Sequence, residues 1–460
     1  LTAWYFLSAG LILGGQWAYE ELGWGGFWAW DPVENAAFMP WLTGTAFLHS
    51  VMIQEKRNML KIWNVVLIIL TFGLTIVGTF LTRSGIINSV HAFTQSEIGP
   101  AFLIFLAFIL VIGFGLLFKR IQMLESEHKI ESVLCRENAF LAQNVLLVGI
   151  AFTVLLGTTF PLLAEAVRGT KLSIQAPFFN TIIAPMGYLL LLLMGIGTLI
   201  AWRKSSWEGL LRNFKNPLIL ATAGTVFLAW FLADRDLLWS VHTIFWLTIF
   251  VTSTIVLEIV KAVQAKSSQT KSNFIMALFY VIARNPRRYG GLLIHFGVVL
   301  MFLGFAGTFF KVERNMTLES GVPQEIGEYS LEFKQMEEFK VGNATHRAAI
   351  VNVFDKEGNF LEVLKPAKSF YPTQPQPLTE VAIRRSFLED LYLIFSSENG
   401  GEQDSITLRV FINPLVGWAW MALPVFTLGV GLSMSYRPKS LVAHETILRE
   451  RYLAAQALNS

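Results

Sequence analysis

Residues 289–310 read YGGLLIHFGVVLMFLGFAGTFF, and this stretch decides the fold class. It holds no Asp, Glu, Lys or Arg, and a helix of this length crosses the roughly 30 Å hydrocarbon core of a bilayer. The whole chain shares this character, since 53% of its 460 residues are hydrophobic and only 15% are charged. The composition excludes an ordinary soluble protein and predicts an α-helical polytopic membrane protein.

Apolar runs of similar length recur along the chain. The loops between them alternate between strongly and weakly basic, and the positive-inside rule predicts that the strongly basic set is cytoplasmic. The weakly basic loops, including 19–37 and 83–98, are therefore predicted to face outward. We expect about ten transmembrane helices, at residues 2–18, 38–54, 62–82, 99–118, 139–161, 181–202, 217–233, 238–262, 289–310 and 414–435.

The segment before the last apolar run has a different pattern. Short alternating runs, such as Arg347–Val353 and Ile406–Ile412, are broken by Gly, Pro and Asn and predict a small β-rich domain outside the membrane. Because the chain opens inside an apolar stretch at Leu1, we interpret it as N-terminally truncated. The predicted plan is a transmembrane core at 1–310 with an aromatic loop within 19–40, a β-rich domain at 311–413, a final helix at 414–435 and a cytoplasmic tail at 436–460.

The outward loop between the first two spans carries the most distinctive motif. Residues 23–35 read GWGGFWAWDPVEN, which places three tryptophans among three glycines. Glycine lets the backbone approach a ligand closely, indoles supply rigid flat faces, and Asp31-Pro32 fixes a turn. The pattern favours a planar apolar ligand. The alternative is an aromatic belt at the level of the lipid headgroups.

Two histidines fall inside predicted spans at one depth. His49 and His295 each lie about six residues from the basic end of their helix, or roughly 9 Å into the membrane. A histidine in a span is costly unless it has a partner, and imidazole is a common axial ligand of heme iron. The pair therefore predicts a buried, non-covalent b-type heme. The alternative is two unrelated hydrogen bonds in helix packing.

These motifs resemble the CcmF/NrfE family of cytochrome c maturation heme lyases, and the resemblance extends over essentially the whole chain. The loop is similar to the WWD motif, a heme platform at the periplasmic surface, and 41–50 and 295–297 are similar to the segments that hold a transmembrane heme b. The resemblance implies that His91 is one axial ligand of the platform heme and that the second lies upstream of Leu1. It implies that the platform is lined by Trp24, Trp28, Trp30 and Asp31, with Glu34 and Asn35 in support.

The remaining histidines and outward arginines are weaker candidates. His242, near the outer end of a span, is an alternative iron ligand, whereas His128, His346 and His444 are predicted to be ordinary surface residues. A solvated His91 is the alternative to its role as a ligand. Arg83 and Arg168 face outward, where they pair either with heme propionates or with lipid headgroups.

The resemblance implies a role in cytochrome c biogenesis at the bacterial inner membrane, with the active loops on the periplasmic side. Heme would arrive from a CcmE-type chaperone and be joined by thioether bonds to the Cys-x-x-Cys-His of apocytochrome c, presented by CcmH/CcmI-type subunits. Quinol is an expected electron donor, lipid an expected neighbour and nucleic acid is not a partner. Cys135 is the single cysteine, so the chain itself holds no heme covalently.

Two other functions remain open at this point, and so does the question of whether the chain is itself an enzyme. A heme transporter or exporter would use the outward and buried sites as stations on one path, but the internal repeats common in transporters are not seen. A quinol-linked b-type electron carrier explains His49 and His295 but leaves the tryptophan loop unexplained.

Overall fold

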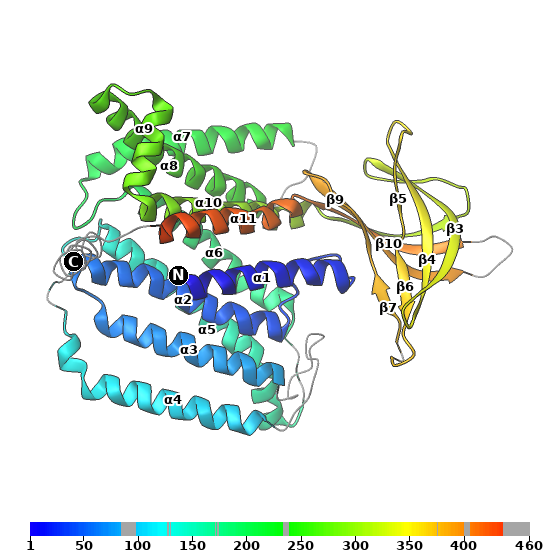
Figure 1. The fold of residues 1–460 in the computed structure, drawn as a ribbon, viewed down its shortest axis with the longest axis horizontal. Coiled ribbons are helices and arrows are strands. Elements are labelled where there is room, and N and C mark those ends of the chain that lie inside the picture. The colour runs from blue at the N-terminus through cyan, green and yellow to red at the C-terminus, as the bar shows by residue number, and fades with distance from the viewer. Residues whose placement is uncertain are drawn as a thin grey trace, which may run out of the picture.

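The computed structural model describes residues 1–460 except 84–97, 127, 129, 171, 173, 233–238, 375, 400–404 and 436–460. The described part is a helical bundle with a β-sandwich at one end (Figure 1). Its helices are α1 (Thr2–Glu21), α2 (Pro32–Arg57), α3 (Lys61–Arg83), α4 (Gly99–Lys119), η1 (Ile121–Leu124), α5 (Arg136–Arg168), α6 (Ala176–Leu199), α7 (Trp207–Phe231), α8 (Trp239–Thr270), α9 (Phe274–Arg284), α10 (Pro286–Gly307), η2 (Thr308–Phe310) and α11 (Val416–Met434).

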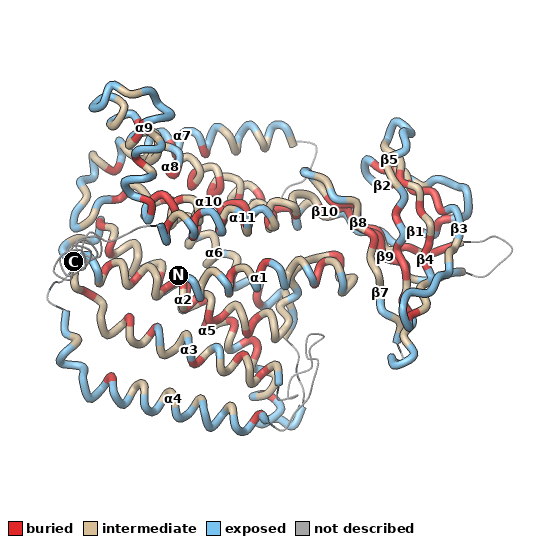
Figure 2. The backbone as a smooth tube through the Cα atoms, in the orientation of Figure 1, coloured by how far each residue is buried: buried red, intermediate tan, exposed pale blue. Residues whose placement is uncertain are grey.

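The prediction of a polytopic helical membrane protein is confirmed. In the described part of the chain, nine helices are long and apolar enough to span a bilayer: α2 to α8, α10 with η2, and α11. The tenth predicted span corresponds to α1, a helix of 20 residues that lies beside α2 and α11 but is not among the nine. Figure 2 shows that α4 on the bundle surface is mostly exposed, and its Ile104 and Val111 are 71% and 72% exposed, as lipid-facing side chains are.

The β-sandwich lies between α10 and α11 in the chain, which confirms a β-rich domain before the last helix. One sheet has the strand order β1-β10-β9-β8, and the other has the order β2-β3-β4-β6-β7, with β5 paired to β4. Apolar side chains from both sheets fill the space between them, as alternating strands require. The strands are β1 (Val312–Glu319), β2 (Gln324–Ile326), β3 (Tyr329–Val341), β4 (Ala344–Asp355), β5 (Phe360–Leu364), β6 (Ala367–Phe370), β7 (Leu378–Glu380), β8 (Ala382–Arg384), β9 (Glu389–Asn399) and β10 (Ser405–Pro414).

The helices α10 and α11 pack unusually closely because glycines recur along α10. A Cβ added to Gly297 would overlap the ring of Phe426, and one added to Gly304 would lie 2.7 Å from the Cβ of Ala419. Small residues at such positions let helix backbones approach in membranes. The two chain connections of the β-sandwich are therefore held together at the end of one tight helix pair.

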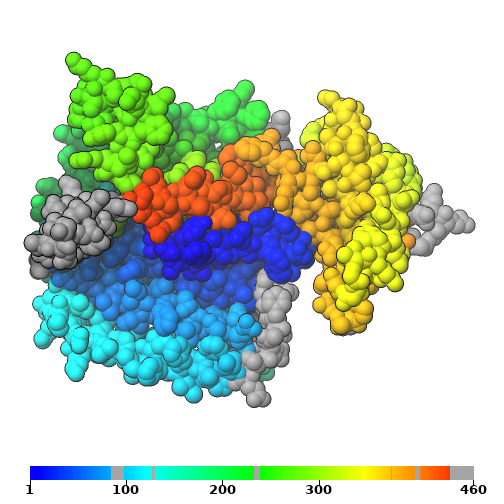
Figure 3. Space-filling view, viewed as in Figure 1, coloured from blue at the N-terminus to red at the C-terminus, as the bar shows by residue number. Residues whose placement is uncertain are grey.

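The bundle has separate apolar clusters rather than one core. One cluster draws on α2, α3, α5 and α6, and another on α6, α7, α8, α9 and α10. In the space-filling view the β-sandwich projects beyond the end of α1 and α11 (Figure 3). We call this end of the bundle the sandwich end, and the other end the basic end, since Arg57, Arg136 and Arg288 lie there.

Candidate functional site

The tryptophan loop, residues 22–31, joins α1 to α2 at the sandwich end. Gly25 has a φ of +66°, which favours glycine, and an added Cβ would lie 2.5 Å from the ring of Phe411 in β10. Phe27 packs in a cluster with Tyr19, Tyr392 and other side chains of the sandwich junction. The first half of the loop is therefore seated on the β-sandwich.

The second half of the loop is fixed to the bundle. Trp30 has a φ of +59°, an uncommon value for a residue with a side chain. Its ring stacks on Phe179 at 4.9 Å between centroids and 12° between planes, and its Nε1–H donates to Asn180 Oδ1 at 2.8 Å. Trp28 packs edge-on against Trp30 and Phe38 at 5.8 and 5.7 Å. These contacts hold the rings of Trp28 and Trp30 in one arrangement.

The three tryptophans keep part of their surface accessible. Trp24, Trp28 and Trp30 are all half-buried. The structure brings the indoles of Trp28 and Trp30 into contact and leaves part of the surface of all three tryptophans accessible. Such surfaces suit a flat apolar ligand.

The polar residues of the motif shape the loop. The Asp31 carboxylate accepts a hydrogen bond from the Val33 amide at 3.0 Å, and Glu34 Oε2 accepts from the Ala29 and Asp31 amides at 3.0 Å each. This is a capping box at the start of α2. Asn35 Nδ2 donates to the Trp30 carbonyl at 3.1 Å. Their interactions within the protein set the backbone on which the indoles sit.

A buried polar network that the sequence did not reveal joins the loop region to the β-sandwich. Tyr19 Oη donates to Asp390 Oδ2 at 3.3 Å and accepts from Asn413 Nδ2 at 3.0 Å, and Asp390 is 1% exposed. Burial raises the pKa of the Asp390 carboxyl to about 6. In the sequence, the only sign of this network is that Asp390 and Asn413 are polar residues at strand ends. Their partner Tyr19 is far away in the sequence.

The second candidate site is the histidine pair. The structure brings His49 of α2 and His295 of α10 together, with ring centroids 6.0 Å apart and ring planes within 4°. His49 Nδ1–H donates to the Thr45 carbonyl at 2.9 Å, which leaves Nε2 with its lone pair. Gln143 Nε2 is 3.5 Å from that atom. His295 Nδ1 is buried and has no hydrogen-bond partner among the described residues.

A continuous run of contacts joins the two sites. Trp30 and Phe38 pack at 6.3 Å, Phe38 stacks on Trp41 at 5.8 Å, and Trp41 stacks on Trp4 at 6.0 Å. Trp4 Nε1–H donates to Thr45 Oγ1 at 2.8 Å, and Thr45 carries the carbonyl that binds His49. The start of α2 and His49 are about 26 Å apart along the helix. The aromatic run fills much of that distance.

The other candidates that the structure describes do not join either site. His91 and His444 lie outside the described residues, and His128 is exposed. His242 lies in the first turn of α8, beside Tyr188 and Trp246 in a shallow groove. His346 is half-buried rather than a free surface residue, because its Nδ1 bonds Ser369 Oγ at 2.7 Å and its ring stacks on Phe339.

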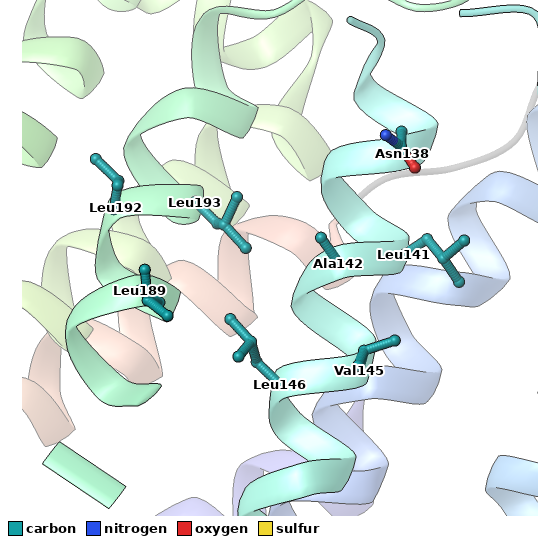
Figure 4. A pocket seen from close by; sticks show the side chains of 8 residues that line it. All are labelled: Asn138, Leu141, Ala142, Val145, Leu146, Leu189, Leu192 and Leu193. Atoms are coloured by element: carbon teal, nitrogen blue, oxygen red, sulfur yellow. The ribbon is translucent and has the colours of Figure 1, made fainter. Parts of the chain in front are cut away.

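A hollow of about 480 Å³ between α5 and α6 is not a candidate catalytic or metal-binding site. Figure 4 shows aliphatic side chains around it, and the amide of Asn138 is the one polar side chain in its lining. It has no titratable or metal-binding group. An acyl chain is a sufficient occupant for such a groove on a membrane protein.

Comparisons with known proteins agree with this arrangement of a Trp-bearing bundle and a β-sandwich. Residues 1–87 match the family model described as Cytochrome C assembly protein, and residues 309–414 match the model described as CcmF C-terminal beta-sandwich. A solved structure named Cytochrome c Heme Lyase CcmF matches with a TM-score of 0.75 and 33% identity, over 94% of this chain and 64% of that one. The chain belongs to the CcmF/NrfE family.

Curated relatives carry the same two names. Cytochrome c-type biogenesis protein CcmF of Pseudomonas fluorescens is 36% identical over 91% of this chain, and CcmF of Escherichia coli is 35% identical over 95%. Cytochrome c-type biogenesis protein NrfE of Haemophilus influenzae is 30% identical over 91%. The chain spans 62%, 65% and 63% of the length of these relatives.

The histidine pair fits the heme that a resemblance to CcmF implies. An imidazole nitrogen binds a first-row metal at about 2 Å, so two bonds in line and two ring radii come to about 6 Å between ring centroids. The observed 6.0 Å matches that span. The Thr45 carbonyl fixes the His49 tautomer as second-shell partners of metal ligands do, and a metal bond would satisfy the buried polar edge of His295.

Proposed function

We propose that this chain is the heme-handling part of a cytochrome c heme lyase, with a heme platform at the tryptophan loop. The observation that carries the proposal is the loop itself: half-exposed Trp28 and Trp30, fixed by Phe179 and Asn180, beside a backbone seated on the β-sandwich. An aromatic belt would not need a left-handed Trp30, a capping box and a β-domain to fix its indoles. Pre-ordered flat faces instead suit a planar ligand that must be held in one orientation.

The sandwich end is proposed to face the periplasm of a bacterial inner membrane. Arginine and lysine side chains gather at the other end, where Arg57, Arg136 and Arg288 form ion pairs or cation–π contacts. The positive-inside rule supports a cytoplasmic location for that end. The tryptophan loop and the β-sandwich then meet partners on the outer side. These would be a CcmE-type chaperone, which delivers heme, and apocytochrome c with its CcmH/CcmI-type presenting subunits.

The chemistry proposed at the platform is thioether formation. The two thiols of a Cys-x-x-Cys-His segment add across the two vinyl groups of heme, so that each S–H hydrogen goes to carbon as each S–C bond forms. No net oxidation occurs. The protein supplies orientation: the indoles hold the flat face, and the Asp31 and Glu34 caps keep the loop from yielding. His91, which lies outside the described residues, is the proposed axial ligand, and Trp24 is proposed to line the platform.

The histidine pair is proposed to hold a second, buried b-type heme as an electron relay. Such a heme supplies one-electron chemistry between a quinol donor in the membrane and the platform. The chain's own part is to hold the rings of His49 and His295 parallel and 6.0 Å apart, with Thr45 fixing the His49 tautomer. A reduced platform iron and reduced thiols favour the attachment reaction.

The test begins with a reduced-minus-oxidised visible spectrum of the detergent-purified full-length protein. We expect a b-type signal that His49→Ala and His295→Ala each abolish, whereas the control His346→Ala leaves it unchanged. Loss of attachment to a Cys-x-x-Cys-His reporter in Trp28→Ala and Trp30→Ala, with the b signal retained, would support the platform separately. A spectrum without heme, or one indifferent to both histidine changes, would contradict the buried relay. Heme carried across the membrane of vesicles without attachment would favour a transporter.

A further inference from the structure

Three helices repeat one spacing at the basic end of the bundle. On each helix a residue of the histidine layer lies seven positions from a cation, so the two share a helix face about 10 Å apart. The residues of the histidine layer lie deeper in the membrane, and the three cations form a second layer near the basic end. The pairs are His49 and Lys56 on α2, Gln143 and Arg136 on α5, and His295 and Arg288 on α10.

Two of these three cations lie over one indole. Lys56 Nζ lies 4.6 Å from the ring centroid of Trp202, and Arg136 Cζ lies 5.5 Å from the same centroid. Lys56 is also close enough to Arg136 and Arg288 to be repelled by their charges. Phe140 connects the layers, since its ring packs edge-on against both His49 and Trp202, at 5.5 and 5.9 Å.

Two of the three cations, Lys56 and Arg136, lack the carboxylate partner that the neighbouring arginines have among the described residues. Arg287 pairs with Glu55 at 2.7 Å, and Arg288 pairs with Glu258. Among the described residues, no carboxylate lies within ion-pair distance of Lys56 or Arg136. Arg136 Nη2 donates to the Thr198 carbonyl at 3.0 Å, but its Nε is buried and has no hydrogen-bond partner in the part of the chain that the structure describes.

Lys56 and Arg288 are exposed and Arg136 is half-buried, and cations gathered in this way repel one another unless an anion joins them. We propose that Lys56 and Arg136, with Arg288 beside them, bind the propionate carboxylates of the heme that His49 and His295 would hold. The inference rests on the buried heme of the proposed function. Both propionates of heme leave one edge of the macrocycle, and the cations lie on one side of the histidine layer. Arg136 offers the planar fork that matches a carboxylate.

The shared chemistry is an anionic oxygen group, and a lipid phosphate is the other source. The test distinguishes heme propionate from lipid phosphate by removing the carboxylate charge from heme and leaving the lipid unchanged. Full-length protein purified from heme-depleted cells is titrated with hemin and with hemin dimethyl ester, which keeps the ring and iron but has no carboxylates. We expect wild-type protein to bind hemin about 10- to 100-fold more tightly than the ester, since hydrogen bonds to charged groups contribute about 1.5–3 kcal/mol.

Variants locate the effect. The double variant Lys56→Gln/Arg136→Gln should bind hemin and the ester alike, with the bis-histidine spectrum retained, and Arg136→Lys should restore part of the preference. The control Lys119→Gln/Arg212→Gln removes the same two charge types at the same end, from α4 and α7, and should keep the full preference. Equal binding of the two hemes by wild-type protein overturns the proposal without any variant, so misfolding does not obscure it.

The outcomes also separate this proposal from the one on which it rests. If His49→Ala abolishes binding of both hemes while wild type does not distinguish them, the buried heme stands and the propionate site is wrong. A lipid phosphate would then be the occupant, and anionic lipid should co-purify with wild type and not with the double variant. If wild type binds neither heme, both proposals are contradicted.

Discussion

Replacing Gly25 by alanine should detach the tryptophan loop from the β-sandwich. The new Cβ would lie 2.5, 2.6 and 2.7 Å from three ring atoms of Phe411, whereas ordinary contacts are about 1 Å longer. Overpacking of this kind costs about 1–3 kcal/mol, and the left-handed backbone at φ +66° adds about 1–2 kcal/mol for a residue with a Cβ. The sum is about 2–5 kcal/mol.

That free energy should appear as local opening, because the loop is displaced more easily than a helix. Hydrogen exchange of the amides in residues 22–31 should speed up by about 30-fold or more, since every 1.4 kcal/mol is a factor of ten. Gly26→Ala is the matched control, as an added Cβ there meets nothing within 4 Å. If the Gly25 and Gly26 variants exchange alike, the loop is not seated on Phe411 as described.

Three further outcomes are expected. Because burial raises the pKa of Asp390 from 3.8 to about 6, its carboxyl holds a proton more tightly when the sandwich is docked. Docking should therefore weaken by up to about 3 kcal/mol as pH rises from about 4 to 6 and then level off; hydrogen-exchange protection, corrected for the pH dependence of the intrinsic exchange rate, should show this change in wild type and not in Asp390→Asn. Gly304→Leu should force α10 and α11 apart and lower the thermal midpoint by several degrees, while Gly291→Ala, with nothing within 4 Å, should not. Trp30→Phe should keep the stack on Phe179 but lose the bond to Asn180, so that platform affinity for heme falls less than in Trp30→Ala, as measured by titration.

Hydropathy was enough to predict the membrane class and the β-rich domain, because both follow from local patterns. It was less informative about α1, whose apolar run is interrupted by polar residues such as Ser8 and Gln16. Those side chains make specific contacts: Trp41 Nε1–H donates to Ser8, and Gln16 donates to Glu20. A window average treats them only as a loss of hydropathy.

For the sites, two things could not be predicted from the sequence: how each helix is rotated about its axis, and which residues far apart in the sequence come into contact. Spacing placed His49 and His295 at one depth but not on facing sides of their helices, since the azimuth of one helix relative to another depends on packing. Similarly, the motif identified the loop, but Asp390 and Asn413 reach Tyr19 across 371 and 394 residues. No local pattern carries such a contact.

The β-sandwich leaves α10 and returns to α11 at nearly one point, since the backbone of Gly307 touches that of Pro414. It is thus a domain with two short tethers fixed side by side, and it cannot travel far from the loop that it covers. Any protein captured by the sandwich is then held at an effective local concentration of about millimolar order beside the tryptophans, however dilute it is in solution. Weak contacts between the β-sandwich and several different proteins would then be enough to bring each of those proteins to the same loop in turn.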